Sequence, residues 1–335
     1  MRAAAFTELV GPDGVDVIER DDPEPGPGEA VVDVAACSIN RHDLWILQGD
    51  SAMVDADDLP FVSGLDVAGV VDAVGPRVSA VEPGDRVVLC PNETCGSCQF
   101  CREGPENRCE NFSLYHGGLA ESAQVDADRL VAVPEEVDLT TAAALPTAYV
   151  TAYRMLQRAD VEAGDRVFVP GATGGVGVAT VQLCAMLGIE TVGTSRSAAK
   201  LDRVRDLGLD RGIESGDPGE IEAAVDGHVD AVVNHLGGEY SKLGQSVLRR
   251  GGRMVVCGRT AGGTSEFRVA DLFLRHKEIV GSTMGTQGDL QRLVGFVADG
   301  ELSPVVDRTY PLAETGAAFA AMAGDDSVGK TVVEP

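Results

Sequence analysis

A glycine-rich turn between an apolar run and an amphipathic run constrains this chain more than any other stretch. The turn follows the short branched run 166–170, which has the composition of a strand buried on both faces of a parallel sheet. Apolar residues at helical spacing come after it and continue to Gly188, a residue type that commonly ends a helix. Glycines at such a junction let the backbone approach a pyrophosphate at the helix N-terminus. The sequence therefore predicts a dinucleotide site at Gly171, Ala172, Thr173, Gly174, Gly175, Val176 and Gly177.

Strand-like and helix-like segments are distributed unevenly along the 335 residues. Residues 1 to about 135 contain short alternating segments separated by Gly and Pro turns, which predicts a strand-rich domain. Beyond residue 166, strands at 189–194, 229–233, 253–257 and 278–282 alternate with helices at 198–207, 240–248 and 271–275. This alternation predicts an α/β fold with a doubly wound parallel sheet. Between the two regions we expect a helix at 139–145 and another at 147–156, separated by Pro146. Near the C-terminus we expect helices at 288–298 and 315–322 and a strand at 330–333.

The charge of the chain excludes several classes of partner. The formal charge is −26, the acids are spread along the whole length, and only four residues are lysine, a balance that resembles proteins of halophilic organisms. We expect the folded state to need salt, and we expect neither nucleic acid nor an anionic membrane as a partner. No apolar run approaches the roughly 20 residues that span a bilayer. A cytoplasmic location and a small-molecule substrate are therefore expected.

Four of the eight cysteines lie close together in the segment 90–112. Their spacing is C-x2-C-x2-C-x7-C, in a lobe rich in Gly, Pro and Asn. Four thiolates in so short a loop suit one closed tetrahedral zinc ion, which would fix a segment that has almost no apolar core. An iron–sulfur cluster can also use four thiolates, but the ferredoxin spacing is missing. The sequence predicts one structural Zn²⁺ held by Cys95, Cys98, Cys101 and Cys109.

The glycine turn and the cysteine lobe together resemble the medium-chain dehydrogenase/reductase superfamily, which includes zinc alcohol dehydrogenases and quinone oxidoreductases. Further strings that fit are GLDVAGVV at 64–71, PGDRV at 83–87, GGLAE at 117–121, LPTA at 145–148 and GK at 329–330. The resemblance implies a GroES-like β-rich catalytic domain over 1–148 and 281–335, and a Rossmann NADP-binding domain over 149–280. It also implies a homodimer or homotetramer, with dimers formed through the edge strand near 278–282. Further cofactor contacts are implied for Thr151, Leu236, Cys257 and Lys330.

The sequence departs from this family where zinc alcohol dehydrogenases hold a catalytic zinc. Those enzymes use a Cys, the His of a Gly-His-Glu string, and a Cys or Asp at the entry to the Rossmann domain. The matching positions here are Asn40, Leu65 and about Thr147, with Asp66 in place of the Glu. Leucine cannot coordinate zinc, and Asn and Thr are poor ligands for it. We therefore expect no catalytic zinc, and the alternative is an unconventional ligand set of Cys37, His42 and Asp66.

The strand after the glycine-turn helix indicates which nicotinamide cofactor is used. An NAD site normally ends this strand with an acid, about 20 residues after the glycines, that accepts hydrogen bonds from the ribose. Ser195 stands there instead, and Arg196 and Lys200 add positive charge suited to a 2′-phosphate. The alternative is that these two cations only solvate a helix start. The pattern predicts NADP(H), and the A-x-G-G-x-G turn, with Ala172 first, also resembles quinone-reductase-like and enoyl-reductase-like members.

Without a Lewis acid, the substrate must already accept hydride readily, as quinones, conjugated enones and enoyl thioesters do. We expect Asn40 to stabilise negative charge on the substrate oxygen through its amide. His42, roughly at the proton-relay position of alcohol dehydrogenases, is expected to donate a proton. Trp45 is expected to wall the substrate pocket, and Thr147 completes the predicted catalytic set.

The leading prediction is thus an NADPH-dependent oxidoreductase of quinones or of activated C=C or C=O substrates. Two alternatives stay open at the level of sequence. One is a zinc-type alcohol or aldehyde dehydrogenase with an unusual catalytic metal site. The other is an NADPH-binding protein without turnover.

Overall fold

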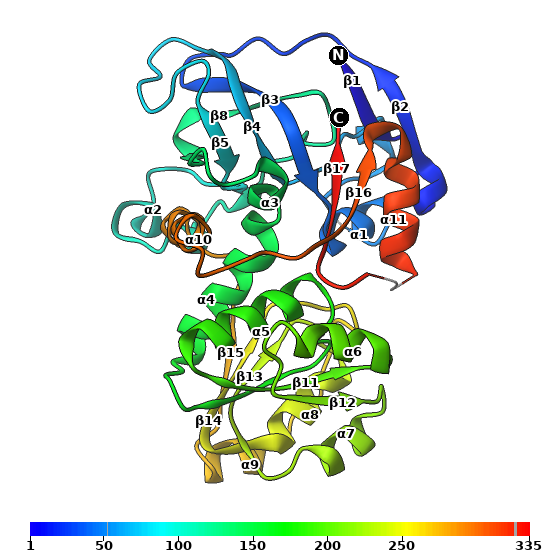
Figure 1. Ribbon diagram of the computed structural model, residues 1–335, viewed down its shortest axis with the longest axis vertical. Coiled ribbons are helices and arrows are strands. Elements are labelled where there is room, and N and C mark those ends of the chain that lie inside the picture. The colour runs from blue at the N-terminus through cyan, green and yellow to red at the C-terminus, as the bar shows by residue number, and fades with distance from the viewer. Residues whose placement is uncertain (52, 325–326) are drawn as a thin grey trace. The chain divides into compact units, whose positions relative to one another are not determined.

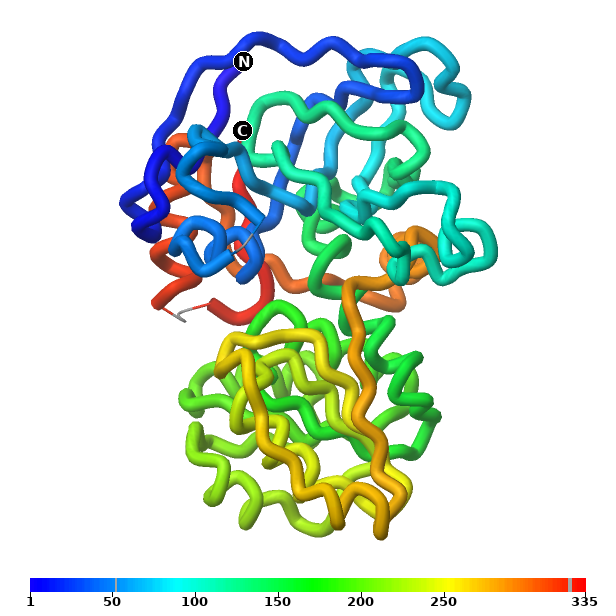
Figure 2. The backbone as a smooth tube through the Cα atoms, turned by 180° about the vertical axis from the view of Figure 1, so that it is seen from behind, coloured from blue at the N-terminus to red at the C-terminus, as the bar shows by residue number. Residues whose placement is uncertain are grey.

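The chain folds into two compact units in the computed structural model, which describes residues 1–51, 53–324 and 327–335. Unit 1 comprises Met1–Thr147 and Thr286–Pro335, and unit 2 comprises Ala148–Gly285. The chain therefore leaves unit 1 once and later returns to it. In both views the last segment of the sequence lies among the first strands (Figures 1 and 2).

Unit 2 is built on a six-stranded parallel sheet in the order β12-β11-β10-β13-β14-β15. Counted along the chain, this order is 3-2-1-4-5-6, which is that of a doubly wound dinucleotide-binding sheet. The predicted parallel sheet is thus confirmed, and the order reverses between β10 and β13. The strands are β10 (Arg166–Val169), β11 (Glu190–Ser195), β12 (Arg211–Glu214), β13 (Val229–Asn234), β14 (Leu248–Val256) and β15 (Glu278–Gly281).

Helices alternate with these strands and bury the apolar residues of the sheet. Phe168, Val192 and Val232 are fully buried in one apolar cluster. The strand β12 and the helix after it were not predicted, because β12 is only four residues long and contains a glycine. The helices of unit 2 are α4 (Val150–Ala159), α5 (Gly175–Leu187), α6 (Ala198–Arg205), α7 (Pro218–Ala224), α8 (Glu239–Val247) and α9 (Val269–Leu274).

Unit 1 contains a seven-stranded, mainly antiparallel sheet, in which β8 pairs with β3 beside the path β16-β17-β3-β4-β5-β9. The C-terminal strand β17 pairs with β3, which brings Val332 opposite Ser38. This pairing places the start of β17 beside the end of β3, where the predicted catalytic segment begins. The strands are β3 (Glu29–Ser38), β4 (Asp66–Val74), β5 (Arg86–Leu89), β8 (Ser122–Asp126), β9 (Leu130–Ala132), β16 (Val306–Pro311) and β17 (Lys330–Glu334).

Smaller elements complete unit 1. The hairpin β1 (Arg2–Phe6) with β2 (Val15–Glu19) packs on the C-terminal helix α11 (Thr315–Ala323), where Phe6 meets Phe319 with ring centroids 5.6 Å apart. The short pair β6 (Asn92–Glu93) and β7 (Ser113–Leu114) closes the cysteine lobe, which carries α2 (Gln99–Glu103). The remaining helices are α1 (Arg41–Leu47), α3 (Leu139–Ala143) and α10 (Gln287–Ala298).

The structure differs from the prediction at Pro146. Instead of an interruption, a π-helical turn over Leu145–Tyr149 connects α3 to α4. Proline lacks the N–H that an α-helix needs and clashes with the preceding turn, and a wider turn relieves both problems. Thr147 lies within this turn. No helix among the described residues is both long enough and apolar enough to cross a membrane.

Candidate functional site

The glycine turn follows β10 at the point where the strand order of unit 2 reverses, the usual place for a ligand in such sheets. The backbone N–H of Gly171 donates to Thr194 Oγ1 at 3.0 Å, and that of Ala172 donates to the carbonyl of Thr194 at 2.9 Å. Gly171 has φ +69°, a conformation that favours glycine. The buried Thr194, which was not among the predicted residues, thus fixes the turn to the end of β11.

Two glycines of this turn have different reasons to be glycine. A Cβ on Gly177 would lie 2.3 Å from the carbonyl oxygen of Gly171, so the packing of α5 on the turn requires glycine there. A Cβ on Gly174, the residue that precedes α5, would meet nothing closer than 3.9 Å. Gly174 also has an ordinary φ of −78°. The protein itself therefore does not require glycine at 174, whereas a ligand approaching the helix N-terminus would.

The carboxyl ends of β13 and β14 bring further residues to this edge of the sheet. Leu236, a predicted cofactor contact, lies against Gly171, where a Cβ would be 3.2 Å from its Cδ1. Cys257, also predicted, follows β14 and donates its backbone N–H to Asn234. His235 was missed by the sequence analysis, and it too lies beside Gly171. Burial lowers the pKa of His235 to about 4. Thr151, another predicted cofactor contact of unit 2, lies on α4, with its hydroxyl 3.9 Å from the sulfur of Met284.

The predicted 2′-phosphate residues lie together at the end of β11 and the start of α6. Ser195 Oγ accepts the N–H of Ser197 at 3.3 Å, and Ser197 Oγ accepts the N–H of Lys200 at 3.4 Å. Arg196 is exposed, and its side chain packs on Gly216, where a Cβ would lie 3.1 Å from its Cγ and 3.2 Å from its Cδ. Glu214 pairs with Ser195 in the sheet and accepts the N–H of Ala198. Two cations and one acid thus surround the end of this strand.

In unit 1 a buried polar network occupies the positions that correspond to a catalytic zinc site. Its centre is Asp66, which is fully buried. Asp66 Oδ2 accepts from Ser38 Oγ at 2.7 Å, Asn40 Nδ2 at 3.0 Å and Lys330 Nζ at 3.2 Å. Asp66 Oδ1 accepts from Thr147 Oγ1 at 2.5 Å. Every oxygen of this carboxylate therefore has a protein donor.

Lys330 is the cation of this network. It is 3% exposed, and its ammonium donates to Asn40 Oδ1, to the carbonyl of Ile39 and to Asp66. An ammonium has three N–H donors, so all of them have acceptors. Lys330 was predicted as a cofactor contact, and in the structure its ammonium has these three partners inside unit 1.

Asn40 also differs in its contacts from the predicted role. Its amide nitrogen donates to Asp66 at 3.0 Å and to the carbonyl of Ser38 at 3.4 Å, and its amide oxygen accepts from Lys330. An amide has only two N–H donors, so both are already used. The geometry therefore makes Asn40 a bridge between Asp66 and Lys330 rather than a free donor to a substrate oxygen.

A second polar cluster adjoins the first turn of α1. Asp43 is buried and accepts from Ser63 Oγ at 2.5 Å, from the N–H of Gly64 at 3.2 Å and from the N–H of Asn40 at 2.8 Å. His42 precedes Asp43 on this turn and stacks on His116, with ring centroids 5.5 Å apart. Trp45 is half-buried one turn later on the same helix. His116 and Ser63 were not anticipated, because they are distant from α1 in the sequence.

The four predicted cysteines converge. Among the described residues they are the only group of three or more His, Cys, Asp or Glu side chains whose ligand atoms all lie within 4.8 Å of one another. Sγ–Sγ distances are 3.5 Å for Cys98–Cys101 and 3.9 Å for both Cys95–Cys101 and Cys98–Cys109. A tetrahedral ion with Zn–S bonds of about 2.3 Å needs about 3.8 Å. The alternative set of Cys37, His42 and Asp66 does not converge in this way.

Backbone N–H groups point at the sulfur atoms of the lobe, as they do around thiolates. Cys109 Sγ accepts from the N–H groups of Cys95 and Asn111 at 3.3 and 3.4 Å, and Cys95 Sγ accepts from that of Cys98 at 3.4 Å. Hydrogen bonds from the backbone of Ser97, its hydroxyl and the backbone of Cys98 lower the pKa of Cys95 to about 5. A thiolate is the form that binds zinc. The four side chains therefore fit one structural zinc ion.

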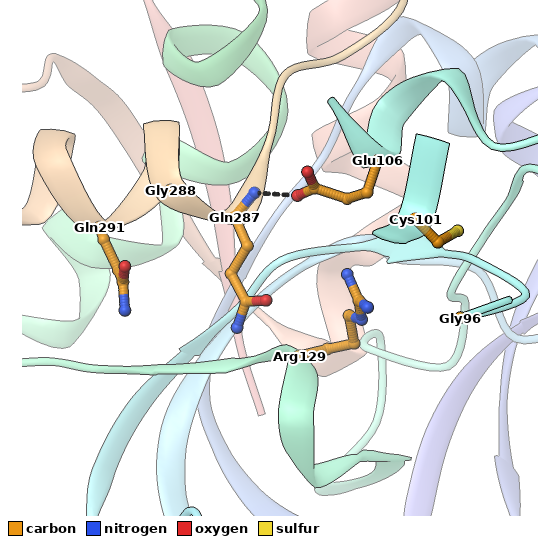
Figure 3. A pocket seen from close by; sticks show the side chains of 7 residues that line it. All are labelled: Gly96, Cys101, Glu106, Arg129, Gln287, Gly288 and Gln291. Atoms are coloured by element: carbon orange, nitrogen blue, oxygen red, sulfur yellow. Dashed lines mark hydrogen bonds between the residues drawn. The ribbon is translucent and has the colours of Figure 1, made fainter. Parts of the chain in front are cut away.

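The cysteine lobe is also tied to the returning C-terminal segment. Glu106 Oε1 accepts the backbone N–H of Gln287 at 2.6 Å, at the start of α10 (Figure 3). A hollow of about 410 Å³ lies beside this bond. It is lined by Gly96, Cys101, Glu106, Arg129, Gln287, Gly288 and Gln291.

Two family descriptions match the chain. Residues 26–135 match "Alcohol dehydrogenase GroES-like domain", and residues 175–299 match "Zinc-binding dehydrogenase". Among curated proteins, the acryloyl-coenzyme A reductase of Metallosphaera sedula is 30% identical over 325 residues, which cover 96% of each chain.

Two solved structures represent different activities on this fold. A structure described as an NAD-dependent alcohol dehydrogenase has a TM-score of 0.90 and 33% identity, and covers 100% of both chains. The 2-octenoyl-CoA carboxylase reductase CinF, solved with NADP and 2-octenoyl-CoA, has a TM-score of 0.91 and 28% identity, and the match covers 99% of this chain and 87% of that one.

Proposed function

We propose that this chain, which belongs to the medium-chain dehydrogenase/reductase superfamily, is an NADPH-dependent reductase of activated double bonds that works without a catalytic zinc. The acceptor class that we favour is an α,β-unsaturated thioester or ketone. Quinones, which the sequence also allowed, accept hydride by the same route and are the second class to test.

The observation that carries this proposal is the position of Lys330. Its ammonium lies among the side chains of Asn40 and Asp66, two of the positions that would have to supply a catalytic metal site. A divalent cation beside a buried ammonium would be strongly repelled. Leu65, at a third ligand position, is fully buried and has no donor atom. These residues do not fit a catalytic zinc.

A substrate that is conjugated to a carbonyl needs no metal to accept hydride. NADPH, when bound, supplies the hydride. The two electrons form a C–H bond at the β-carbon, the π pair moves onto the α-carbon and carbonyl oxygen, and a proton then adds at the α-carbon. The product is the saturated thioester or ketone. The likeness to an acryloyl-coenzyme A reductase and to a structure holding 2-octenoyl-CoA supports this class of substrate.

Residues of unit 2 are proposed to hold the cofactor. The turn from Gly171 to Gly177 presents the N-terminus of α5 to the pyrophosphate, and Gly174 leaves room for it. Arg196 and Lys200 at the end of β11 are proposed to bind the 2′-phosphate, with Ser195 in place of the acid that would repel it. Leu236 and His235 pack beside the turn.

In unit 1, His42 is the side chain proposed to hold the proton for the substrate. Its Nε2 atom has no hydrogen-bond partner among the described residues. Thr147 donates to Asp66, so its hydroxyl oxygen remains able to accept a hydrogen bond. For Asn40 we propose a structural role in place of hydrogen-bond donation to the substrate, since it bonds to both Asp66 and Lys330.

The test is a spectrophotometric screen of NADPH oxidation with acryloyl-CoA, crotonyl-CoA, an enone, a quinone and an aldehyde. Zinc is counted in the same preparation. We expect turnover with the unsaturated thioesters or the enone, a preference for NADPH, and one zinc per chain. Turnover restricted to aldehydes, together with two zinc ions per chain, would refute the proposal.

A second candidate is a zinc-type alcohol dehydrogenase, because a structure with that description covers the whole chain at 33% identity. This reading requires a metal ion displacing Lys330 from Asp66. It predicts NAD⁺-dependent oxidation of simple alcohols that a chelator abolishes. Chelator-resistant reduction of an enoyl thioester would exclude it.

A second copy of the chain is the partner we propose. The strand β15 is at the edge of the sheet in unit 2. The segment that precedes it in the sequence, 267–274, carries four large apolar residues that are exposed to solvent. Such an apolar segment beside an open strand edge favours pairing with another chain. Light scattering should give a dimer or tetramer, and Phe273→Glu should shift it toward the monomer. The exposed residues are Phe267, Val269, Phe273 and Leu274.

A further inference from the structure

Three residues from distant parts of unit 1 form a connected chain of hydrogen bonds that ends at His116. The hydroxyl of Ser63 lies 2.5 Å from Asp43 Oδ1 and 3.4 Å from His116 Nδ1. A serine hydroxyl has one proton, and the short distance to the carboxylate shows where that proton goes. Ser63 Oγ must therefore accept from His116, which fixes the proton of His116 on Nδ1.

The other ring nitrogen of His116 is then an acceptor. Burial lowers the pKa of His116 to about 4, against the opposing effect of Asp43, so the ring is neutral at pH 7 and carries only the Nδ1 proton. Its Nε2 atom is buried and has no partner among the described residues. Phe61 packs against the same ring, with centroids 5.0 Å apart and planes at 65°. The imidazole of His116 is thus held by a hydrogen bond on one side and by an aromatic ring on another.

His116 in turn covers His42. The two rings stack with centroids 5.5 Å apart and planes at 25°. His42 lies in the first turn of α1, next to Asp43, whose carboxylate also accepts the N–H of Asn40. The same carboxylate therefore fixes the start of α1, which carries His42, and the loop that carries His116.

We propose that Asp43, Ser63 and His116 hold the imidazole of His42 in one orientation in the reductase site, which makes His116 a positioning residue for proton delivery. The proposal rests on the proposed function only in taking His42 as the proton donor. It extends the site to His116, which directly precedes the GGLAE string at 117–121 and is not part of it.

The charge state of His42 follows from the same packing. Burial lowers the pKa of His42, and Asp43 acts in the opposite direction. Asp43 and His116 are the titratable groups that affect it, and His116 contributes to the burial by covering the ring. Removing the His116 ring admits water, so the pKa of His42 should rise toward its ordinary value of about 6.5.

The experiment compares His116→Ala with His116→Phe in the full-length protein. Phenylalanine keeps a flat ring over His42 but cannot donate to Ser63, whereas alanine loses both contacts. NMR titration of the ring resonances gives the pKa of His42, and the spectrum is simple because the chain has only five histidines. Kinetics give kcat, KM and the pH profile, and thermal unfolding reports on the fold. His228→Ala, an exposed histidine in unit 2, is the matched control.

In His116→Ala we expect the pKa of His42 to rise and kcat to fall by about 10-fold or more while KM changes little, since general acid catalysis contributes at least that much. In His116→Phe the pKa of His42 should stay low, and kcat should lie between that of the wild type and that of His116→Ala. An unchanged pKa of His42 and an unchanged kcat in His116→Ala would overturn the proposal. The NMR titration does not need turnover, so it tests His116 even if the protein proves inactive with enoyl thioesters.

Discussion

Lys330 and Asp66 form an ion pair of 3.2 Å in the interior of unit 1, although they are 264 residues apart in the sequence. The pair exists because β17 returns to lie beside β3 and so delivers the ammonium to the start of β4. Buried charges are tolerated only when they are paired and hydrogen-bonded, and here Asn40, Ser38 and Thr147 supply the remaining bonds. The C-terminal strand therefore completes the candidate site chemically as well as structurally.

Removing the ammonium should be costly. In Lys330→Met the carboxylate of Asp66 stays buried without its cation, and we expect a loss of about 3–5 kcal/mol in the free energy of unfolding. Urea denaturation measures it. Lys242→Met, at an exposed lysine, is the control. The double variant Lys330→Met with Asp66→Leu should regain part of the loss, and a loss below about 1 kcal/mol in the single variant would contradict the interpretation.

Zinc should be bound by the cysteine lobe alone. Cys101→Ser should reduce the zinc content from one ion per chain to well below half and should expose the lobe to proteolysis, because the loop has little apolar core of its own. Elemental analysis and limited trypsin digestion measure these effects. Cys184→Ala, at a buried cysteine on α5, should keep its zinc. Loss of zinc in that control would place the ion elsewhere.

Gly174 and Gly177 should differ in their response to alanine. Gly177→Ala places a Cβ 2.3 Å from a backbone oxygen, so it should lower the melting temperature strongly. Gly174→Ala has room in the protein and should leave the melting temperature close to that of the wild type, but weaken NADPH binding by about 10-fold or more, because the methyl group blocks the pyrophosphate. Isothermal calorimetry and thermal unfolding separate the two effects. Equal binding of NADPH by wild type and Gly174→Ala would argue against a pyrophosphate at this turn.

The cofactor preference should depend on Arg196. In Arg196→Ser we expect kcat/KM for NADPH to fall by about 10- to 100-fold, since a hydrogen bond to a charged group contributes about 1.5–3 kcal/mol, while kcat/KM for NADH changes little. Arg203→Ala, on the exposed side of α6, is the control. A parallel fall for both cofactors would mean that Arg196 supports the fold and does not recognise the phosphate.

Stability should rise with salt. The formal charge of −26 is distributed over both units, so self-repulsion opposes folding until it is screened. The melting temperature should increase between about 0.05 M and about 2 M KCl. A neutral osmolyte, which does not screen charge, should not reproduce the low-salt part of this increase. A melting temperature independent of KCl would remove the argument for halophilic adaptation.

Features that are local in sequence were predictable. The turn 171–177, the parallel sheet around it and the spacing of four cysteines depend on short-range geometry: a strand, a tight turn, a helix start, or a loop around one ion. The structure agrees in bringing Leu236 and Cys257 to the edge that carries the turn, because parallel strands end on one side of a sheet. Short elements such as β12 and the π-helical turn at Pro146 were not predicted, since their residues have no strong periodic pattern.

The sequence by itself determined that the chain carries a dinucleotide-type turn, a four-cysteine lobe, and no conventional ligands for a catalytic zinc. Only the tertiary structure decided which side chains surround Asp66 and which pack around His42, the proposed proton donor. Strand pairing between β17 and β3 brings Lys330 to Asn40 and Asp66, and the loop before β8 brings His116 to His42. A side chain's free donors depend on the groups packed around it. From the sequence Asn40 was therefore expected to donate to the substrate, whereas in the fold its amide nitrogen donates to Asp66 and to the carbonyl of Ser38.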